Sequence, residues 1–280
     1  MTLDLTAIGR MIGPFAKEYT WRDAILYALG VGAGFDELEF CYEKDLKIIP
    51  SFAVIALDEY MVTAIASSRV NQDGSFHGEQ EFIFHSPIPS HGGTITTEGQ
   101  ISHMYDMGAG KGALIVAESV SRYSNGEKLF TSISTVFSRS DGGFGGEYPP
   151  RQAVMFPDRP PDFPVPDCPT VDQPLIYRLS GDYTTLHADP EVARGRGFEM
   201  PIMAGLCTLG FAARGVIKCL CPGEPERLKR LRNRFSNTLY PGEPIETQIW
   251  KLGEGKAVFK TINVKTQRVT IDHGIAELVC

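Results

Sequence analysis

The chain has 280 residues, of which 42% are hydrophobic and 22% are charged, a globular composition that excludes a disordered chain. The formal net charge of -7, with scattered lysines and arginines, argues against nucleic-acid binding. Six cysteines without C-x-x-C spacing favour free thiols, and no apolar run approaches the roughly 20 residues of a membrane span.

The two ends of the chain predict a soluble, cytoplasmic protein. The first residues, MTLDLTAIGRMIG, have no basic region ahead of an apolar core, so they do not form a secretory signal. Residues 277–280 differ from the Ser-Lys-Leu type of peroxisomal address. We therefore expect a peroxisomal location only if the source is eukaryotic, and then without that signal.

A helix followed by a meander of strands is predicted for the first half. Thr20 and Asp23 have the spacing of a capping box, and the glycines at 30, 32 and 34 end the helix that follows. Asn125-Gly126 is a hairpin signal. Alternating apolar and polar residues predict strands over 79–88, 93–102, 113–124 and 128–140. This order is typical of a helix packed on an antiparallel sheet.

Residues 141–172 change character, because proline and glycine are frequent there. Such a segment predicts no regular element, so we expect an extended connector laid across the surface. The expected organisation is an N-terminal unit over 1–145, a connector over 146–172 and a C-terminal unit over 173–280.

The second unit repeats the order of the first. A strand over 177–182 leads through a loop to a helix that begins at Gly205 and carries an apolar stripe. Further strands are predicted over 230–239, 244–253, 256–266 and 269–279. The two units share element order rather than residue identity, and that order predicts a duplicated fold.

Asp182 and His187 form a candidate acid/base pair on the turn-rich loop before this helix. Both side chains could hold one water molecule, and backbone N–H groups near Gly205 would favour developing negative charge. The spacing leaves a structural reading open. In that reading Asp182 is a turn or capping residue, His187 is a half-buried histidine with its hydrogen bonds satisfied, and Gly205 is an N-cap.

The chain resembles the MaoC-like hydratase 2 family of enoyl-CoA hydratases, in the two-repeat form that also occurs inside peroxisomal multifunctional enzyme type 2. The resemblance covers nearly the whole chain. It rests on YTWRDAILYALGVGAG (19–34), ELEFCYEKDLKIIPSFAVI (37–55), HGEQ (77–80), YDMGAGKGA (105–113), SGDYTTLHADP (180–190), GLCTLGFAARGV (205–216) and RFSNTLYPGE (234–243).

The resemblance implies a double hot-dog fold of the α+β class, with each half an antiparallel sheet around a long helix, and a homodimer. It implies (R)-specific addition of water to trans-2-enoyl-CoA, giving (3R)-3-hydroxyacyl-CoA, with no metal and no cofactor. The residues at the family's catalytic positions are Asp182 and His187, and Gly205 matches the backbone donor to the thioester oxygen. The positions that contact acyl-CoA are His77, Gly78, Lys111, Thr184 and Phe235. The first half would be non-catalytic and would accommodate medium, long, bulky or branched acyl chains.

The chain departs from the family pattern at residues that arrange the site. Thr184 and Thr185 replace asparagine and proline in the Ser-Gly-Asp-x-Asn-Pro-Leu-His motif, and Ala204 replaces histidine. A threonine hydroxyl offers one donor, whereas an asparagine amide both donates and accepts. Lys111 is an inexact match. A biosynthetic 3-hydroxyacyl-thioester dehydratase and a non-catalytic acyl-CoA-binding homologue therefore remain alternatives, whereas a hot-dog thioesterase is disfavoured.

Two other groups of residues are left with weaker interpretations. The basic run over 227–234, RLKRLRNR, could dock CoA phosphates or form a solvated strand edge. The remaining histidines have no ligand-like spacing and are interpreted as surface or structural residues. They are His85, His91, His103 and His273.

Overall fold

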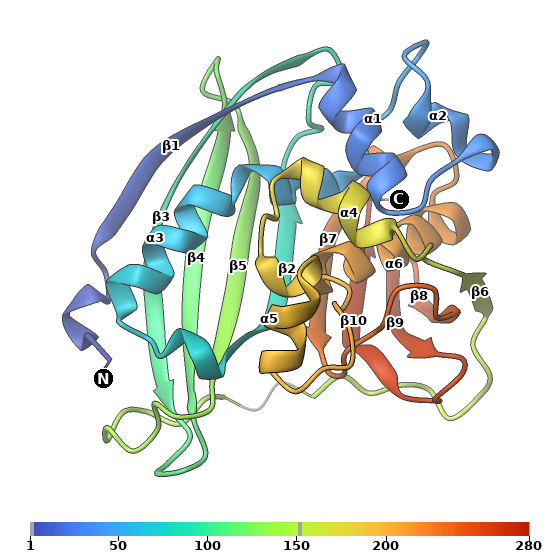
Figure 1. Ribbon diagram of the computed structural model, residues 1–280. Coiled ribbons are helices and arrows are strands. Elements are labelled where there is room, and N and C mark those ends of the chain that lie inside the picture. Colours follow the sequence, from blue (N-terminus) through green and yellow to red (C-terminus); the bar gives the residue numbers. More distant parts are fainter. Residues whose placement is uncertain (1–2, 151–152, 280) are drawn as a thin grey trace.

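One antiparallel sheet of ten strands organises the chain. The computed structural model describes residues 3–150 and 153–279. Its strand order is β1-β3-β4-β5-β2-β7-β10-β9-β8-β6 (Figure 1). The first-half strands are β1 (Met11–Thr20), β2 (Ser75–Phe84), β3 (Gly92–Asp106), β4 (Ala113–Tyr123) and β5 (Lys128–Ser138). The second-half strands are β6 (Phe163–Asp167), β7 (Leu228–Phe235), β8 (Ile245–Gly253), β9 (Lys256–Asn263) and β10 (Val269–Leu278). The two halves join where β2 pairs with β7.

The predicted strands, apart from the one over 177–182, are confirmed with shifted ends. β2 begins at Ser75 rather than at 79, and β7 ends at Phe235 rather than at 239. The Asn125-Gly126 hairpin is also confirmed, since the Gly126 N–H donates to the Tyr123 carbonyl at 2.8 Å. Alternation of apolar and polar residues therefore located every predicted meander strand of the first half.

The first half contains a helix that the sequence patterns do not predict. α1 (Trp21–Gly30) begins as expected with its capping box, in which the Thr20 N–H donates to Asp23 Oδ2 at 2.7 Å. The helix that packs on β1, β3 and β4 is instead α3 (Asp58–Ser68), which follows the 3-10 helix η3 (Pro50–Ala56). All seven residues of η3 are buried, so its sequence lacks the helical repeat of apolar and polar residues that would predict a helix.

In the second half the long helix is α6 (Gly205–Leu220), which packs on β6, β7, β8 and β10 as its apolar stripe predicts.

The strand predicted over 177–182 is wrong. Residues 177–180 instead continue α4 (Gln173–Tyr177) into the 3-10 helix η5 (Arg178–Ser180), and Gly181 and Asp182 follow in the loop. The Gln173 side-chain amide donates to the carbonyls of Leu29 and Gly30, so α4 is held against the end of α1. The short helices are α2 (Leu38–Cys41) and α5 (Pro190–Gly195).

The expectation that the connector contains no regular element is wrong for one stretch. Phe163–Asp167 forms β6, the edge strand that pairs with β8. Pro164 and Pro166 alternate along it, and the backbone nitrogens of alternate residues in an edge strand point away from the partner strand. Proline is therefore tolerated at these two positions.

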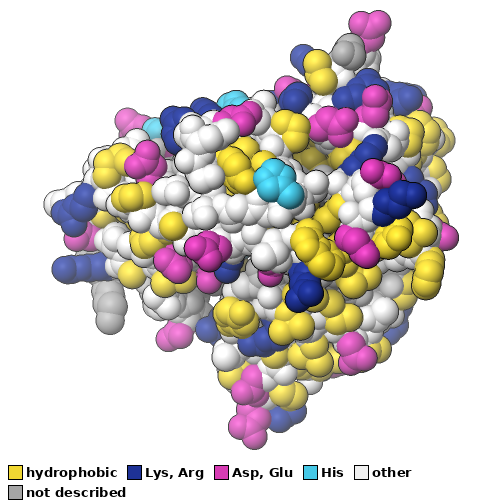
Figure 2. All heavy atoms as spheres, turned by 90° about the horizontal axis from the view of Figure 1, so that it is seen from above, with side chains coloured by type: hydrophobic (Ala, Val, Ile, Leu, Met, Phe, Trp, Pro, Cys, Tyr) yellow, Lys and Arg dark blue, Asp and Glu magenta, His cyan; other side chains and the backbone are white. Residues whose placement is uncertain are grey.

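A hydrophobic core runs through both halves on the helical side of the sheet. Tyr27, Phe52 and Phe82 from the first half pack in the same cluster as Leu209 and Phe259 from the second. The two halves thus share this cluster, whereas a second cluster, which includes Tyr60 and Ile101, belongs to the first half alone. On the face seen in Figure 2, basic and acidic side chains are interspersed with hydrophobic ones. Among the described residues, no single helix is long and apolar enough to cross a membrane.

Candidate active site

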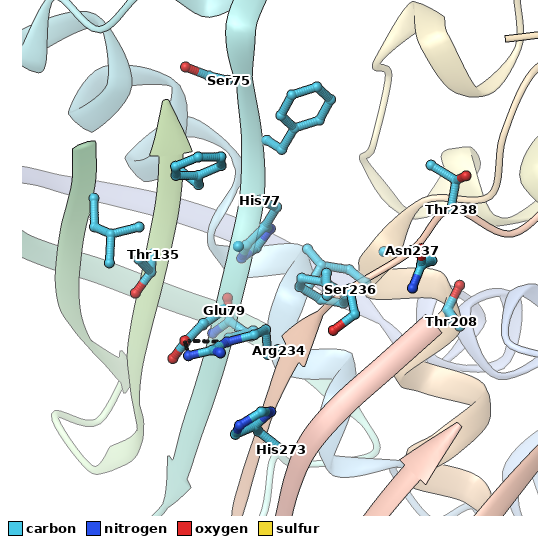
Figure 3. A pocket seen from close by; sticks show the side chains of 18 of the residues that line it. Ser75, His77, Glu79, Thr135, Thr208, Arg234, Ser236, Asn237, Thr238 and His273 are labelled. Carbon is cyan, nitrogen blue, oxygen red and sulfur yellow. Dashed lines mark hydrogen bonds and ion pairs between the residues drawn. The ribbon is translucent and has the colours of Figure 1, made fainter. Parts of the chain in front are cut away.

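A cavity of about 1290 Å³ opens where the two halves meet. It is lined by the start of β2, the end of β7, the loop that follows Gly181 and the first turn of α6, and Tyr148 of the connector also contributes. Figure 3 shows side chains from β2, β5, β7 and β10 around it. Seven of the eight site residues expected from the sequence line this cavity: His77, Gly78, Asp182, Thr184, His187, Gly205 and Phe235.

The Asp182–His187 loop holds its imidazole in a defined orientation. Gly181 has φ of 123°, in the left-handed region that favours glycine, and lets the chain turn after η5. Residues Thr185–His187 form a short 3-10 turn. His187 Nδ1 lies 2.9 Å from the Ile202 carbonyl oxygen, which only accepts hydrogen bonds, so Nδ1 carries the proton. In the tautomer that this contact favours, Nε2 is unprotonated, as a general base requires.

Asp182 sits five residues before this histidine on the same loop, and its side chain is half-buried. Its Oδ1 accepts a hydrogen bond from the Thr184 N–H at 3.2 Å, an interaction that fixes the turn. Asp182 can therefore stabilise the turn and also act in catalysis, because its second carboxylate oxygen takes no part in the turn. Both Asp182 and His187 line the cavity.

Gly205 brings the amino end of α6 to the cavity wall. Ala204 is the N-cap, so the Gly205 N–H is the first of the helical N–H groups that have no partner within the helix. A Cβ at Gly205 would lie 3.0 Å from the Phe235 ring. The missing side chain therefore leaves room for a ligand oxygen to approach an N–H at the positive end of the helix.

His77 faces the same region as a neutral side chain. Burial lowers its pKa to about 4, although the Asp182 charge acts in the opposite direction. Its ring meets the Phe235 ring edge-on with centroids 5.0 Å apart, and its Nε2 is buried without a hydrogen-bond partner. Gly78 follows at a bulge in the pairing of β2 with β5. The His77 ring is therefore uncharged near neutral pH.

Two findings differ from expectation. Lys111 lies in the turn between β3 and β4, where its N–H donates to the Gly108 carbonyl, and it does not line the cavity. His273 lines the cavity, whereas the sequence analysis interprets it as a surface or structural residue. The sequence does not reveal this position, because it depends on a bulge in β10 that brings His273 to the cavity wall.

Residues 228–234 of the basic run lie in β7, and the three arginines among them are paired across the sheet. Arg232 and Arg234 bind Glu79, at 3.0 and 2.6 Å, and Arg230 binds Glu81 at 2.6 Å. These partners neutralise the charges that would dock CoA phosphates. The run therefore ties the two halves together.

Residues 3–150 and 153–279 contain no group of three or more His, Cys, Asp or Glu side chains placed to hold a metal ion. The absence of a metal and of a cofactor from the reaction stays a prediction.

Two family models cover most of the chain. Residues 17–140 match the MFE-2 hydratase 2 N-terminal domain, and residues 152–273 match the MaoC like domain. A probable enoyl-CoA hydratase 2 of Dictyostelium discoideum is 36% identical over 99% of this chain and 97% of that protein. The 3-hydroxyacyl-thioester dehydratase Y of Mycobacterium tuberculosis is 36% identical over 100% of this chain and 99% of that protein.

Solved structures agree with this assignment. The crystal structure of a MaoC-like dehydratase from Phytophthora capsici matches with a TM-score of 0.90 at 32% identity, over 99% of this chain and 98% of that one. A double hot-dog protein of Mycobacterium tuberculosis matches with a TM-score of 0.65 at 12% identity and shows the fold alone. The chain therefore belongs to the MaoC-like hydratase 2 family of hydro-lyases and has its α+β double hot-dog fold.

Proposed function

We propose that the protein hydrates trans-2-enoyl-CoA to (3R)-3-hydroxyacyl-CoA, with Asp182 and His187 as the catalytic residues. This proposal rests on one observation, which is that Asp182, His187 and the amino end of α6 at Gly205 line the same cavity. A base, a carboxylate and an N–H donor are the groups that addition of water to an enoyl thioester requires.

In the proposed reaction the thioester oxygen accepts a hydrogen bond from the Gly205 N–H. This interaction withdraws electrons from the double bond and makes C3 electrophilic. Water held by Asp182 and His187 adds its oxygen to C3 as His187 Nε2 takes a proton. The pair then delivers a proton to C2, so one water is consumed and neither residue changes its charge over the cycle. The reverse sequence is dehydration.

The acyl chain would lie against the first half. The side chains that face the cavity from β3, β4 and β5 are mostly apolar: Tyr105, Leu114, Val116, Ile133 and Phe137. Burying alkyl groups against such a wall is favourable by about 25 cal/mol per Å². The cavity of about 1290 Å³ exceeds an ordinary ligand pocket, which supports a medium, long or bulky acyl group.

The function is tested by following the loss of enoyl-thioester absorbance with the purified protein and its variants. Asp182→Asn and His187→Gln should each lower kcat/KM by about 10²–10⁴-fold, the usual contribution of acid/base catalysis. Asp158→Asn and His91→Gln, at exposed positions outside the cavity, serve as matched controls and should leave the rate unchanged. Either active-site variant retaining wild-type turnover would contradict the assignment of that residue.

A biosynthetic dehydratase is the second candidate, and the full-length similarity to the Mycobacterium tuberculosis dehydratase favours it specifically. The same residues would act in reverse on a 3-hydroxyacyl thioester. Comparing initial rates from crotonyl-CoA and from (3R)-3-hydroxybutyryl-CoA identifies the faster direction, and the (3S) isomer tests stereospecificity. Binding of crotonyl-CoA without turnover would instead identify a non-catalytic homologue. The homodimer and the cytoplasmic location stay predictions.

A further inference from the structure

A carboxylate outside the proposed catalytic pair, that of Asp106, fixes the start of the connector. Asp106 ends β3 and is 7% exposed. Its Oδ1 accepts hydrogen bonds from the N–H groups of Gly108 and Gly143 at 2.8 and 2.7 Å, and its Oδ2 accepts one from Gly145 at 2.6 Å. The Asp106 N–H also donates to the Glu147 carbonyl at 2.8 Å. We call this set of hydrogen bonds the Asp106 clasp, because it joins the turn between β3 and β4 to the connector.

Glycines allow the two segments to approach each other closely. Gly143 and Gly145 have φ of 95° and 82°, in the left-handed region, and direct their N–H groups toward the carboxylate. A Cβ at Gly142 would overlap the carbonyl oxygens of Gly108 and Gly112. Figure 1 shows both segments at the end of the sheet where β3 ends. The backbone of the connector is therefore held against the β3–β4 turn.

The clasp depends on an ionised carboxylate, because each hydrogen bond to it comes from an N–H group. The hydrogen bonds from Gly143 and Gly108 hold the pKa of Asp106 below its ordinary value, so the side chain is charged at neutral pH. In Asp106→Asn an NH2 group would replace one of the two oxygens and would face an N–H donor. This variant therefore breaks part of the clasp while it keeps the size of the side chain.

The clasp places residues at the cavity wall. Tyr105 and Met107, the neighbours of Asp106 in the chain, line the cavity, and so do residues 148–150, which directly follow the clasped segment. The connector is thus part of the wall as well as a link between the two halves. Tyr148 is 66% exposed, so its position depends on the backbone that the clasp fixes rather than on packing in the core.

This part of the wall lies at the far side of the proposed acyl site. Tyr105 pairs with Leu114 on β4, which pairs with Phe137 on β5, and directly paired residues share one face of a sheet. These three side chains belong to the apolar wall against which the acyl chain is proposed to lie. β3 is three strands from β2, where the halves join, so Tyr105 lies roughly 14 Å from that seam at about 4.8 Å per strand. Only a chain that extends across these strands reaches the connector.

We propose that Asp106 is a positioning residue for substrate recognition, whose carboxylate holds residues 148–150 over the distal part of a long acyl chain. This inference rests on the proposed function, since it takes an acyl-CoA whose chain lies against the first half. An alkyl chain on a sheet face is buried on one side only, and the connector would shield its other side from water. Asp106 does not line the cavity, so it acts through the connector.

The test compares hydration of crotonyl-CoA and of trans-2-dodecenoyl-CoA by the wild type, Asp106→Asn and Gly142→Ala. The first variant removes a charge from the clasp, and the second inserts a methyl group between the two segments. Each should raise KM for the dodecenoyl substrate about tenfold, with its kcat and both constants for crotonyl-CoA retained. Asp158→Asn removes an exposed carboxylate of the connector outside the cavity and is the control.

A double variant tests whether the effect passes through the connector. Tyr148→Ala should itself raise KM for dodecenoyl-CoA, and adding Asp106→Asn should have little further effect, because both changes remove the same wall. Thermal unfolding checks that each variant is folded. Equal rises in KM for the two substrates, no rise for either, or full additivity of the two changes would overturn the proposal.

Two further measurements separate this proposal from the proposed function. Amide exchange over residues 142–149 should be faster in Asp106→Asn than in the wild type, and unchanged exchange would reject the clasp whether or not the protein is an enzyme. In calorimetric titrations, Asp106→Asn should bind dodecanoyl-CoA more weakly and butyryl-CoA equally well, a result that supports the proposal even if the wild type hydrates no enoyl thioester. Turnover that depends on Asp182 and His187, with KM unchanged in Asp106→Asn and Gly142→Ala, supports the function and rejects the positioning role.

Discussion

Gly205 and Gly215 belong to the same helix, yet an added methyl group would meet different surroundings at each. At Gly205 a Cβ would lie 3.0 and 3.1 Å from two atoms of the Phe235 ring, which faces the cavity. At Gly215 the nearest atom would be 3.5 Å away, an ordinary van der Waals contact with Val165. The requirement for glycine at position 205 thus comes from the site and not from the packing of α6 as a whole.

Gly205→Ala should lower kcat/KM for crotonyl-CoA by about 100-fold, because the methyl group displaces the Phe235 ring and obstructs the approach of the thioester oxygen. Gly215→Ala is the matched control in the same helix. It should keep full activity and should be stabilised by up to about 1 kcal/mol through helix propensity. Steady-state kinetics and thermal unfolding measure both. Equal losses of activity in the two variants would show that α6 geometry, rather than access to the Gly205 N–H, limits turnover.

The β2–β7 seam is the element that unites the two halves, and ion pairs reinforce its backbone pairing. Glu79 on β2 bonds Arg232 and Arg234 on β7, and its side chain is 22% exposed. Burial disfavours its charge, but the hydrogen bonds and charges of the two arginines outweigh that effect and lower the pKa of Glu79 below its ordinary value. The seam therefore gains stability from the ionised carboxylate.

A carboxylate with a lowered folded-state pKa contributes its full stability above its unfolded pKa, which is 4.5 for glutamate, and loses it as the pH falls through the folded pKa. Glu79→Gln should cost about 2 kcal/mol at pH 7 and should flatten the loss of stability below pH 4.5. Urea unfolding at pH 7, 5, 4 and 3 measures both effects. Glu224→Gln, at an exposed pair, should change little. Parallel pH curves for wild type and Glu79→Gln would contradict this account.

Local signals identify some elements, whereas others depend on tertiary contacts. The Asp182–His187 loop and the start of α6 at Gly205 are visible in the sequence, because they lie within one contiguous stretch. Helix η3 is buried on all sides and shows no period, and residues 177–180 alternate like a strand but are helical because Gln173 holds α4 on the end of α1. His273 reaches the cavity through a bulge, whose position depends on pairing between strands rather than on the residue itself.

At the scale of the whole molecule, a buried charge cluster links α6 to both the first half and the connector. Arg214 in the middle of α6 donates to Glu37 Oε2 at 3.0 Å and to the Val31 carbonyl at 2.9 Å, and it pairs with Asp167 of β6 at 3.0 Å. Arg214 and Glu37 are 9% and 6% exposed. A charge so deeply buried is tolerated only with its partner, so the cluster couples the halves without adding much net stability.

Arg214→Met should therefore destabilise the protein by about 3–5 kcal/mol, because it leaves the Glu37 carboxylate buried without its partner. The double variant Arg214→Met/Glu37→Leu removes both charges and should regain most of that loss, which a double-mutant cycle in urea unfolding measures. Arg159→Met breaks an exposed pair with Asp162 and should shift stability by less than about 1 kcal/mol. A double variant as unstable as Arg214→Met alone would mean that the hydrogen bond from the arginine to the Val31 carbonyl, rather than the pairing of its charge with Glu37, holds the two halves together at this point.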